Sequence, residues 1–176
     1  MNLRDRYDDD GVLAEGPQRY RVDERVVCDP WPATLVEIAA TLGSGSESRR
    51  VLYQHLVGFS SWFDRALAGD PRRELWVRGR FGSTLAPEVD ELDLVVHYAS
   101  GQLTAGDRWL LQVLTAQPIE LHPYRLVVTP LRHDGPEYMF ELDQEVSRSR
   151  VRTLRPETME QVVAEWLRVI GEEEDG

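Results

Sequence analysis

The segment from Glu91 to Tyr98 constrains the fold most strongly, because it places acids and large apolar residues in alternation. Side chains two positions apart on a strand point to the same face. Glu91 and Asp93 are therefore neighbours on one face, while Leu92 and Leu94 point to the other. A strand with one apolar face must cover that face with further elements. The segment predicts a core strand that carries two carboxylates side by side.

A glycine-containing turn precedes this strand, in the segment from Trp76 to Thr84. A strand that ends in glycine can turn sharply and approach a phosphate without a Cβ in the way. Backbone N–H groups in such a turn can hold phosphate oxygens. The two arginines beside the glycine, Arg78 and Arg80, have two interpretations: they bind phosphate, or they balance the charge of the acids that follow.

The paired acids suggest metal chemistry. Two adjacent carboxylates repel each other unless a cation lies between them, and an all-oxygen site of this kind suits Mg²⁺ or Mn²⁺. Nucleotidyl and phosphoryl transfer use such an ion to neutralise phosphate charge and to activate the attacking hydroxyl. We therefore predict Glu91 and Asp93 as metal ligands. The alternative is that both acids form the wet face of a half-exposed strand.

The order of these features resembles the signature of the nucleotidyltransferase superfamily that includes DNA polymerase beta. That signature is a hydrophobic residue, glycine, then glycine or serine, a spacer, and an acid–hydrophobic–acid strand. The chain looks most like an uncharacterised bacterial family of nucleotidyltransferase-like proteins. The matching pieces are Gly11-Val12-Leu13, the segment from Ser46 to Arg50, and Gly79-Arg80-Phe81-Gly82-Ser83. They occur in order over residues 11–98.

The resemblance implies a set of site residues. Gly79, Arg80, Gly82 and Ser83 would hold the nucleotide, and Glu91 and Asp93 would hold Mg²⁺ or Mn²⁺. Arg80 stands where the family has serine. An alternative register uses Gly82-Ser83 as the Gly-Ser pair, with a short spacer before Glu91.

Active members place a third carboxylate on a later strand. In this chain its position falls near Tyr124 or Arg125, and neither is acidic. Glu120, which could share a strand face with His122, is the substitute for that position if the register shifts. The expected catalytic set is therefore Glu91, Asp93 and Glu120.

Two functions follow from the resemblance, and catalysis is left open between them. An active protein would transfer a nucleotidyl group from an NTP to a hydroxyl of a protein, an RNA or a small molecule. A catalytically degenerate protein would act as a binding module, for example an antitoxin, an immunity protein or another defence-related protein. The missing third acid and the substituted serine favour the second, and the retained acid pair favours the first.

Composition excludes several other classes. The formal net charge is -11, which disfavours non-specific binding to DNA. The chain has no lysine, so a lysine nucleophile and the lysine of a phosphate-binding loop are excluded. The lone Cys28 suggests a small buried residue. Without a membrane-spanning apolar run or a signal segment, the sequence predicts a cytoplasmic protein with no membrane partner.

The expected architecture is α+β, with a mixed sheet, helices packed mainly on one face, and a nucleotidyltransferase-like core. Residues 1–10 are predicted to be a disordered acidic tail, residues 11–170 a single domain, and residues 171–176 an acidic C-terminal tail. Expected helices are residues 33–42, a helix capped at Ser44 to Glu47 with apolar residues from Leu52 to Leu67, residues 105–116, and a last helix beginning near Pro156. Expected strands are residues 75–79, 92–98 and 119–131, with 138–142 as a hairpin partner.

Three further predictions concern single residues. The helix over 105–116 is expected to turn Trp109, Leu110, Val113 and Leu114 inward. His97 lies on the same strand face as the acids, where it either lines a cleft or is a core residue. Arginines between Arg148 and Arg155 form a basic cluster that either meets phosphate or balances the acidic tail.

Overall fold

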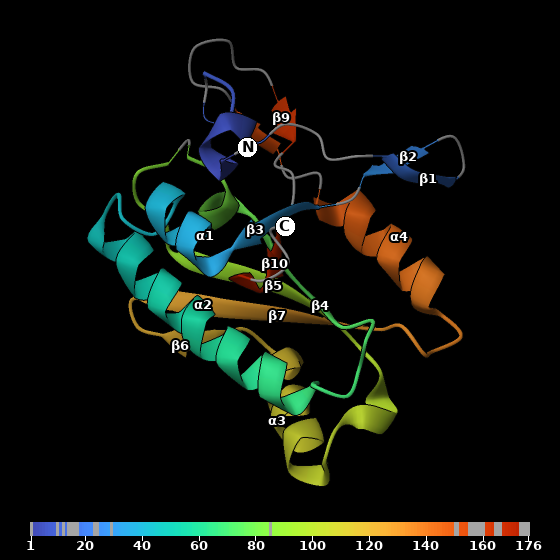
Figure 1. Ribbon diagram of the computed structural model, residues 1–176. Coiled ribbons are helices and arrows are strands. Elements are labelled where there is room, and N and C mark those ends of the chain that lie inside the picture. The colour runs from blue at the N-terminus through green and yellow to red at the C-terminus, as the bar shows by residue number, and fades with distance from the viewer. Residues whose placement is uncertain are drawn as a thin grey trace.

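A six-stranded mixed sheet forms the centre of the molecule (Figure 1). The computed structural model describes residues 2–9, 11, 13, 18–22, 25–28, 30–84, 86–149, 152–154, 161–163 and 167–172. The strands are β3 (Trp31–Thr34), β10 (Leu167–Ile170), β4 (Glu74–Arg78), β5 (Glu91–Tyr98), β7 (Tyr124–Arg132) and β6 (Ile119–Leu121), in that order across the sheet. β5 is parallel to β7 and β3 to β10, and the other neighbours are antiparallel. The predicted α+β class with a mixed sheet is confirmed.

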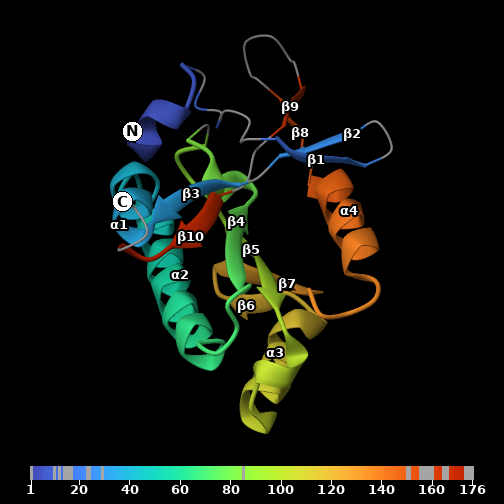
Figure 2. The same cartoon turned by 45° about the vertical axis from the view of Figure 1, so that its right-hand side comes forward.

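Helices cover the two faces of this sheet unequally. The helices α1 (Leu35–Thr41), α2 (Glu47–Ala66) and α3 (Ala105–Ala116) contribute to the larger core on one face, and α4 (Tyr138–Ser149) packs on the other. In Figure 2 the central strands lie between α2 on the left and α4 on the right. The expectation that helices pack mainly on one face is therefore confirmed.

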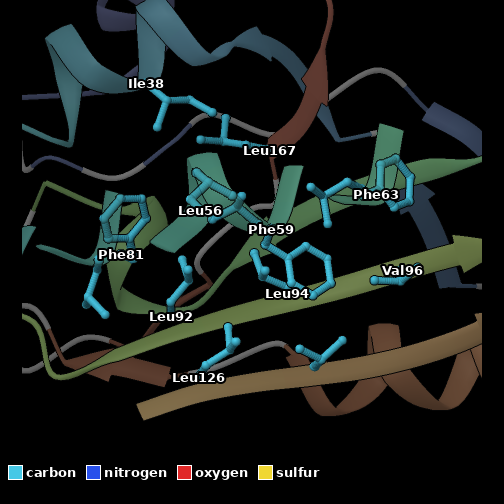
Figure 3. Packing of buried hydrophobic residues seen from close by; sticks show 14 of the residues in the cluster. Ile38, Leu56, Phe59, Phe63, Phe81, Leu92, Leu94, Val96, Leu126 and Leu167 are labelled. Carbon is cyan, nitrogen blue, oxygen red and sulfur yellow. The ribbon is translucent and has the colours of Figure 1, made fainter. Parts of the chain in front are cut away.

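The helix α2 supplies most of the larger core. Its predicted apolar face is buried from Leu52 to Phe63, and it meets the Leu92–Leu94–Val96 face of β5 (Figure 3). Burial of each such side chain stabilises the fold by about 1.5–3 kcal/mol. The predicted cap was misplaced by two residues: Ser46, not Ser44, caps the helix by accepting a hydrogen bond from the Arg49 amide.

The bounds of α3 agree with the prediction, but of the residues predicted to face inward only Leu114 packs against the core. Leu111 is buried, whereas Trp109 is 64% exposed and Val113 41% exposed. This helix packs chiefly against β7, near the end of the sheet, so only a narrow stripe of its surface is covered.

The segment from Tyr138 was expected to pair back as a strand, and this is wrong, because it forms α4. Two residues one helical turn apart face the sheet: Tyr138 and Leu142 pack on Trp76, Val95 and Leu131. The helical period therefore matches the apolar surface that β4, β5 and β7 leave uncovered on this face.

The predicted C-terminal helix is also wrong where the structure describes it. Residues 161–163 form β9, which pairs with β8 (Arg152–Leu154), and Leu167–Ile170 form β10 inside the main sheet. Val169 and Ile170 in β10 are β-branched, and such residues pack well on a pleated surface. Pro156 and Trp166 lie outside the described residues.

The N-terminal residues differ from the predicted disordered tail over 1–10. Leu3–Arg6 form a short 3-10 helix capped by Asn2, and Leu3 and Leu13 are buried in the main core. Two apolar residues hold the segment to the domain although acids surround them. The arm that follows contains a hairpin of β1 (Gln18–Val22) and β2 (Arg25–Cys28). Positions 173–176 of the predicted acidic tail, the Cys28 side chain and the side chains of the basic cluster lie outside the described part.

Candidate functional site

Glu91 and Asp93 lie on one face of β5, as predicted, and Leu92 and Leu94 lie in the core on the other face. The sheet register places an arginine directly opposite each acid. Arg78 on β4 pairs with Asp93, and Arg125 on β7 pairs with Glu91. On this face of the sheet, each of the two acids therefore has an arginine beside it on a neighbouring strand.

Arg78 is the centre of a buried charge cluster. Its Nε donates to Asp93 Oδ2 at 2.9 Å, and its two terminal nitrogens donate to Glu145 Oε2 and to Thr129 Oγ1, each at 2.9 Å. The Arg78 side chain is only 10% exposed, and those of Asp93 and Glu145 are 20% and 13% exposed. The Arg78 guanidinium, on β4, thus links β5, β7 and α4 through hydrogen bonds.

Glu91 is held in a similar way at the surface. Arg125 Nη2 donates to its Oε2 at 2.8 Å, and both side chains are partly exposed. Arg125 is one of the two residues, with Tyr124, near which the resemblance implies the third carboxylate. Glu120 lies in register with Arg125 on the far side of that residue, two strands from Glu91 or about 10 Å away across the sheet. The structure brings Glu91 and Asp93 together but separates Glu120 from them by an arginine.

Burial and neighbouring charges set the protonation of this cluster. Burial raises the pKa of the Asp93 carboxyl, and Glu91 and Glu145 raise it further, which together outweigh the opposite effect of Arg78. Burial lowers the pKa of the Arg78 guanidinium, but Asp93 and Glu145 outweigh that effect and raise it. Burial therefore decides the direction of the pKa shift at Asp93, and the two neighbouring carboxylates decide it at Arg78.

The arrangement does not fit a magnesium ion. One oxygen of Asp93 is paired with the Arg78 guanidinium, and one oxygen of Glu91 with that of Arg125. The positive charges of these two guanidinium groups oppose the binding of a metal cation beside them. Among the residues that the structure describes, no group of three or more His, Cys, Asp or Glu could hold a metal. One observation points the other way: Asp93 Oδ1 is buried and accepts no hydrogen bond.

The predicted nucleotide-binding turn is present between β4 and β5. Gly79 has φ +78°, a conformation that favours glycine, and Arg80–Gly82 form a single 3-10 turn. Of the four predicted residues, Arg80 is exposed, Gly79 is half-buried, and Gly82 and Ser83 are buried. The turn therefore presents Arg80 to solvent while its later residues face inward.

Arg49 of α2 forms hydrogen bonds to the backbone of this turn. Its guanidinium donates to the backbone carbonyls of Leu42, Arg80, Phe81, Ser83 and Ala86, with the shortest contact, 2.6 Å, to Ser83. Arg49 is 4% exposed. Burial lowers its pKa, although Tyr7 and Glu88 act against this. Sequence analysis missed this role, yet Arg49 precedes Leu52 and Leu56 at helical spacing, which places it on the buried side of α2.

The N-terminal segment covers the same turn from the opposite side. The carbonyl of Gly11 accepts three hydrogen bonds, from the Thr84 amide, the Thr84 hydroxyl and the Ser83 hydroxyl, each at 3.1 Å. Tyr7 donates its hydroxyl to the Gly82 carbonyl at 2.8 Å, and burial raises its pKa, so that the hydroxyl keeps its proton. Of the predicted nucleotide-binding residues, Ser83 and Gly82 thus have polar groups bonded to the N-terminal segment, whereas Arg80 faces solvent.

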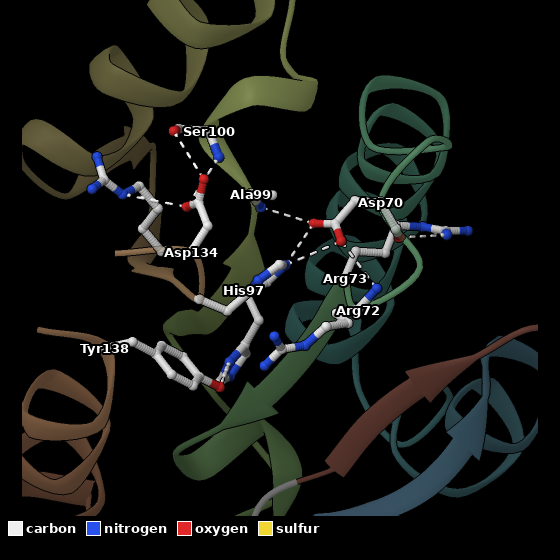
Figure 4. Close-up of polar contacts among 10 residues, drawn as sticks. Asp70, Arg72, Arg73, His97, Ala99, Ser100, Asp134 and Tyr138 are labelled. Carbon is white, nitrogen blue, oxygen red and sulfur yellow. Dashed lines mark hydrogen bonds and ion pairs between the residues drawn. The ribbon is translucent and has the colours of Figure 1, made fainter. Parts of the chain in front are cut away.

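His97 lies on the acid face of β5, as predicted, but α4 covers it. The side chain is 2% exposed, packs on Trp76 at 4.0 Å between ring centroids, and shares a 2.9 Å hydrogen bond with the Tyr138 hydroxyl through Nδ1. Figure 4 shows this contact between the strand and the first turn of α4. His97 therefore belongs to the packing of α4.

A second buried polar pair, which sequence analysis missed, lies at the carboxyl end of β5. Asp70 accepts from His133 Nε2 at 2.8 Å, from the Ala99 amide at 2.8 Å and from the Arg72 amide at 3.0 Å (Figure 4). Burial raises the Asp70 pKa, but these hydrogen bonds outweigh it and hold the pKa below its usual range. Asp70 is 1% exposed, so the pair joins three loops rather than facing a substrate.

None of the helices in the described part of the chain combines the length and the apolar character needed to cross a membrane. Comparison of the chain with models of protein families, with curated proteins and with solved structures finds no match.

Proposed function

We propose that this chain is a catalytically degenerate nucleotidyltransferase-like protein that acts as a binding module for a protein or RNA partner. One observation carries the proposal: the two acids that would hold the metal each hold an arginine instead. The order of the glycine turn, the acid pair and the parallel β5–β7 pair supports the nucleotidyltransferase-like core.

Two further features support loss of catalysis. Neither Tyr124 nor Arg125, near which the third carboxylate is expected, is acidic, and the N-terminal arm occupies the donors of Ser83 and Thr84. Each change removes a different part of the machinery that nucleotidyl transfer needs: the metal ligands and the phosphate contacts.

Nucleotidyl transfer from an NTP is the second candidate, favoured by the free Oδ1 of Asp93. It would require Arg78 and Arg125 to exchange their carboxylates for nucleotide phosphates, so that Glu91 and Asp93 become available to Mg²⁺ or Mn²⁺. Arginine binds phosphate through the same bidentate geometry as carboxylate, which makes the exchange chemically reasonable.

Calorimetric titration separates the two candidates. ATP and GTP are titrated with Mg²⁺ or Mn²⁺ into the wild type, Asp93→Ala and the control Asp134→Ala, which removes an exposed acid at the other end of the sheet. The proposal expects no metal-dependent nucleotide binding in any of the three. Binding that Asp93→Ala abolishes and Asp134→Ala preserves would contradict it and establish the second candidate.

A further inference from the structure

The outer side of α3 is an exposed surface with apolar residues and no charge. Trp109 and Val113 lie one helical turn apart and are 64% and 41% exposed, while Leu111 on the opposite side of the helix is buried. In Figures 1 and 2, α3 lies at the lower end of the molecule, away from α1 and α4. We call the exposed residues on this side the α3 face; they are Ala105, Gly106, Trp109, Gln112, Val113 and Ala116.

The α3 face differs in charge from the chain as a whole, whose formal net charge is -11. Asp107, the acid of α3, lies on the inner flank, where it accepts from the Trp62 indole and is 3.6 Å from Arg65. Arg108, at the edge of the α3 face, donates to two backbone carbonyls of the preceding segment. Both charged side chains of α3 are therefore held within the chain, and neither belongs to the α3 face.

These properties favour a second copy of the chain as the partner. Two chains that each carry a net charge of -11 repel each other, so they associate best through a surface without acids. A partner of opposite charge would instead be drawn to the surfaces that carry the acids. An apolar, uncharged helix face can pack on its own copy across a two-fold axis, because the same patch then serves both subunits.

The order of residues on the α3 face fits an antiparallel pair of helices. In a pair centred at position 111, Trp109 of one copy lies opposite Val113 of the other, so that a large side chain meets a smaller one. Gly106 lies opposite Ala116, which lets the two helices approach closely. A Cβ at Gly106 would meet nothing within 4 Å, so the fold of the single chain does not require glycine there. The antiparallel arrangement also opposes the two helix dipoles.

We propose that the α3 face is the contact surface of a homodimer, in which two copies of α3 pack antiparallel across a two-fold axis. Trp109 is its anchor, because buried aromatic residues carry much of the binding energy of such contacts. A tryptophan buries roughly 150–250 Å², so two copies of Trp109 and Val113 stay below the roughly 1,200–2,000 Å² of a stable interface. The dimer is therefore weak, with a Kd on the order of 10–100 µM. The inference does not depend on the acid pair or on the proposed function.

Sedimentation velocity of the full chain at concentrations from about 5 to 500 µM tests the dimer, since this range spans the expected Kd. It compares the wild type with Trp109→Glu and with the control Val36→Glu, which adds the same charge at an equally exposed position on α1. We expect Trp109→Glu to raise the Kd at least about tenfold and Val36→Glu to leave it within about twofold. A wild type that stays monomeric throughout, or equal effects of the two variants, would overturn the proposal.

A mixture of two variants tests the antiparallel pairing. Trp109→Glu and Val113→Lys each place a charge in the interface, so each alone should weaken the dimer. In a mixed pair the introduced carboxylate of one copy faces the introduced ammonium of the other, and the remaining Trp109 faces the remaining Val113. We expect the mixture to associate more tightly than either variant alone, and a mixture that associates no more tightly would contradict the antiparallel pair. Unfolding midpoints equal to that of the wild type, expected because both positions are exposed, establish that each variant is folded.

The salt dependence of association distinguishes this contact from one driven by opposite charges. Raising the NaCl concentration from about 0.05 to 0.5 M screens the repulsion between two acidic chains, so the homodimer should become tighter. Association of the wild type that weakens over the same range would show attraction between opposite charges, and it would overturn the proposal.

Discussion

At the scale of single residues, two buried arginines organise the candidate site in different ways. Arg78 is neutralised by Asp93 and Glu145, whereas Arg49 donates to buried backbone carbonyls, among them those of Phe81 and Ser83. Arg78 therefore fixes the charges of the acid face, and Arg49 fixes the shape of the glycine turn. The sequence alone suggested charge balance for Arg78 as one of two interpretations, because acids follow it along the chain.

Replacement of Arg49 tests its role in the turn. Arg49→Ala leaves several buried carbonyls without a donor, and we expect the free energy of unfolding to fall by about 3–5 kcal/mol. Arg49→Lys keeps the charge but lacks the planar fork, so its loss should be intermediate. Urea unfolding measures both, with Arg50→Ala as the exposed control that should change stability by less than about 0.5 kcal/mol. Equal effects at positions 49 and 50 would contradict the assignment.

Asp70 gives the fold a defined dependence on pH. Because its folded-state pKa is held below the unfolded value of about 3.9, its stabilisation is present above that value and disappears as pH falls through the folded-state pKa. We expect wild type to be more stable than Asp70→Asn at neutral pH and the difference to shrink below about pH 4. Unfolding measured from pH 2 to 7 checks this, with exposed Asp90→Asn as control. A difference that grows on acidification would contradict it.

At the scale of elements, α4 closes the acid face, and sequence reasoning assigned its first residues to a strand. Tyr138, Leu142 and Glu145 face the sheet, and each makes a different kind of contact: a hydrogen bond to His97, apolar packing, and an ion pair with Arg78. A run from Tyr138 to Leu142 contains aromatic residues that also suit a strand, so local preference could not decide. The segment forms a helix because its apolar side packs on the patch that β4, β5 and β7 leave uncovered. That patch exists only after the sheet has formed.

Truncation of Leu142 tests the docking of α4. Leu142 is 1% exposed, and Leu142→Ala should lower the free energy of unfolding by about 2–5 kcal/mol through lost burial and a cavity. Met139→Ala is the matched control on the same helix, because Met139 is 53% exposed, and it should cost less than about 0.5 kcal/mol. Thermal or urea unfolding of the two variants measures the contrast. Similar losses at both positions would mean that α4 is not packed on the sheet through Leu142.

At the scale of the whole molecule, sequence reasoning predicted the elements whose own residues show a clear pattern of apolar and polar positions. It missed the elements whose type depends on pairing with residues far away in the chain. The α2 face, the β4 turn and the acid strand β5 show clear periodicity, so they could be located from their residues alone. β10 could not, because its place between β3 and β4 comes from long-range pairing at the end of the chain. Likewise, the acid pair was predictable, but Arg125 opposite Glu91 follows from sheet register, which the sequence does not state.

The central claim is that arginines, and not a metal, neutralise the acid face. Paramagnetic Mn²⁺ tests it most directly, because a bound ion broadens the amide resonances of residues close to it. Increasing amounts of Mn²⁺ are added to the isotopically labelled protein, and Leu92, Asp93 and Leu94 are compared with Tyr98 at the far end of the same strand. The account predicts no selective broadening at residues 92–94. Selective broadening there at low Mn²⁺, absent in Asp93→Ala, would contradict it.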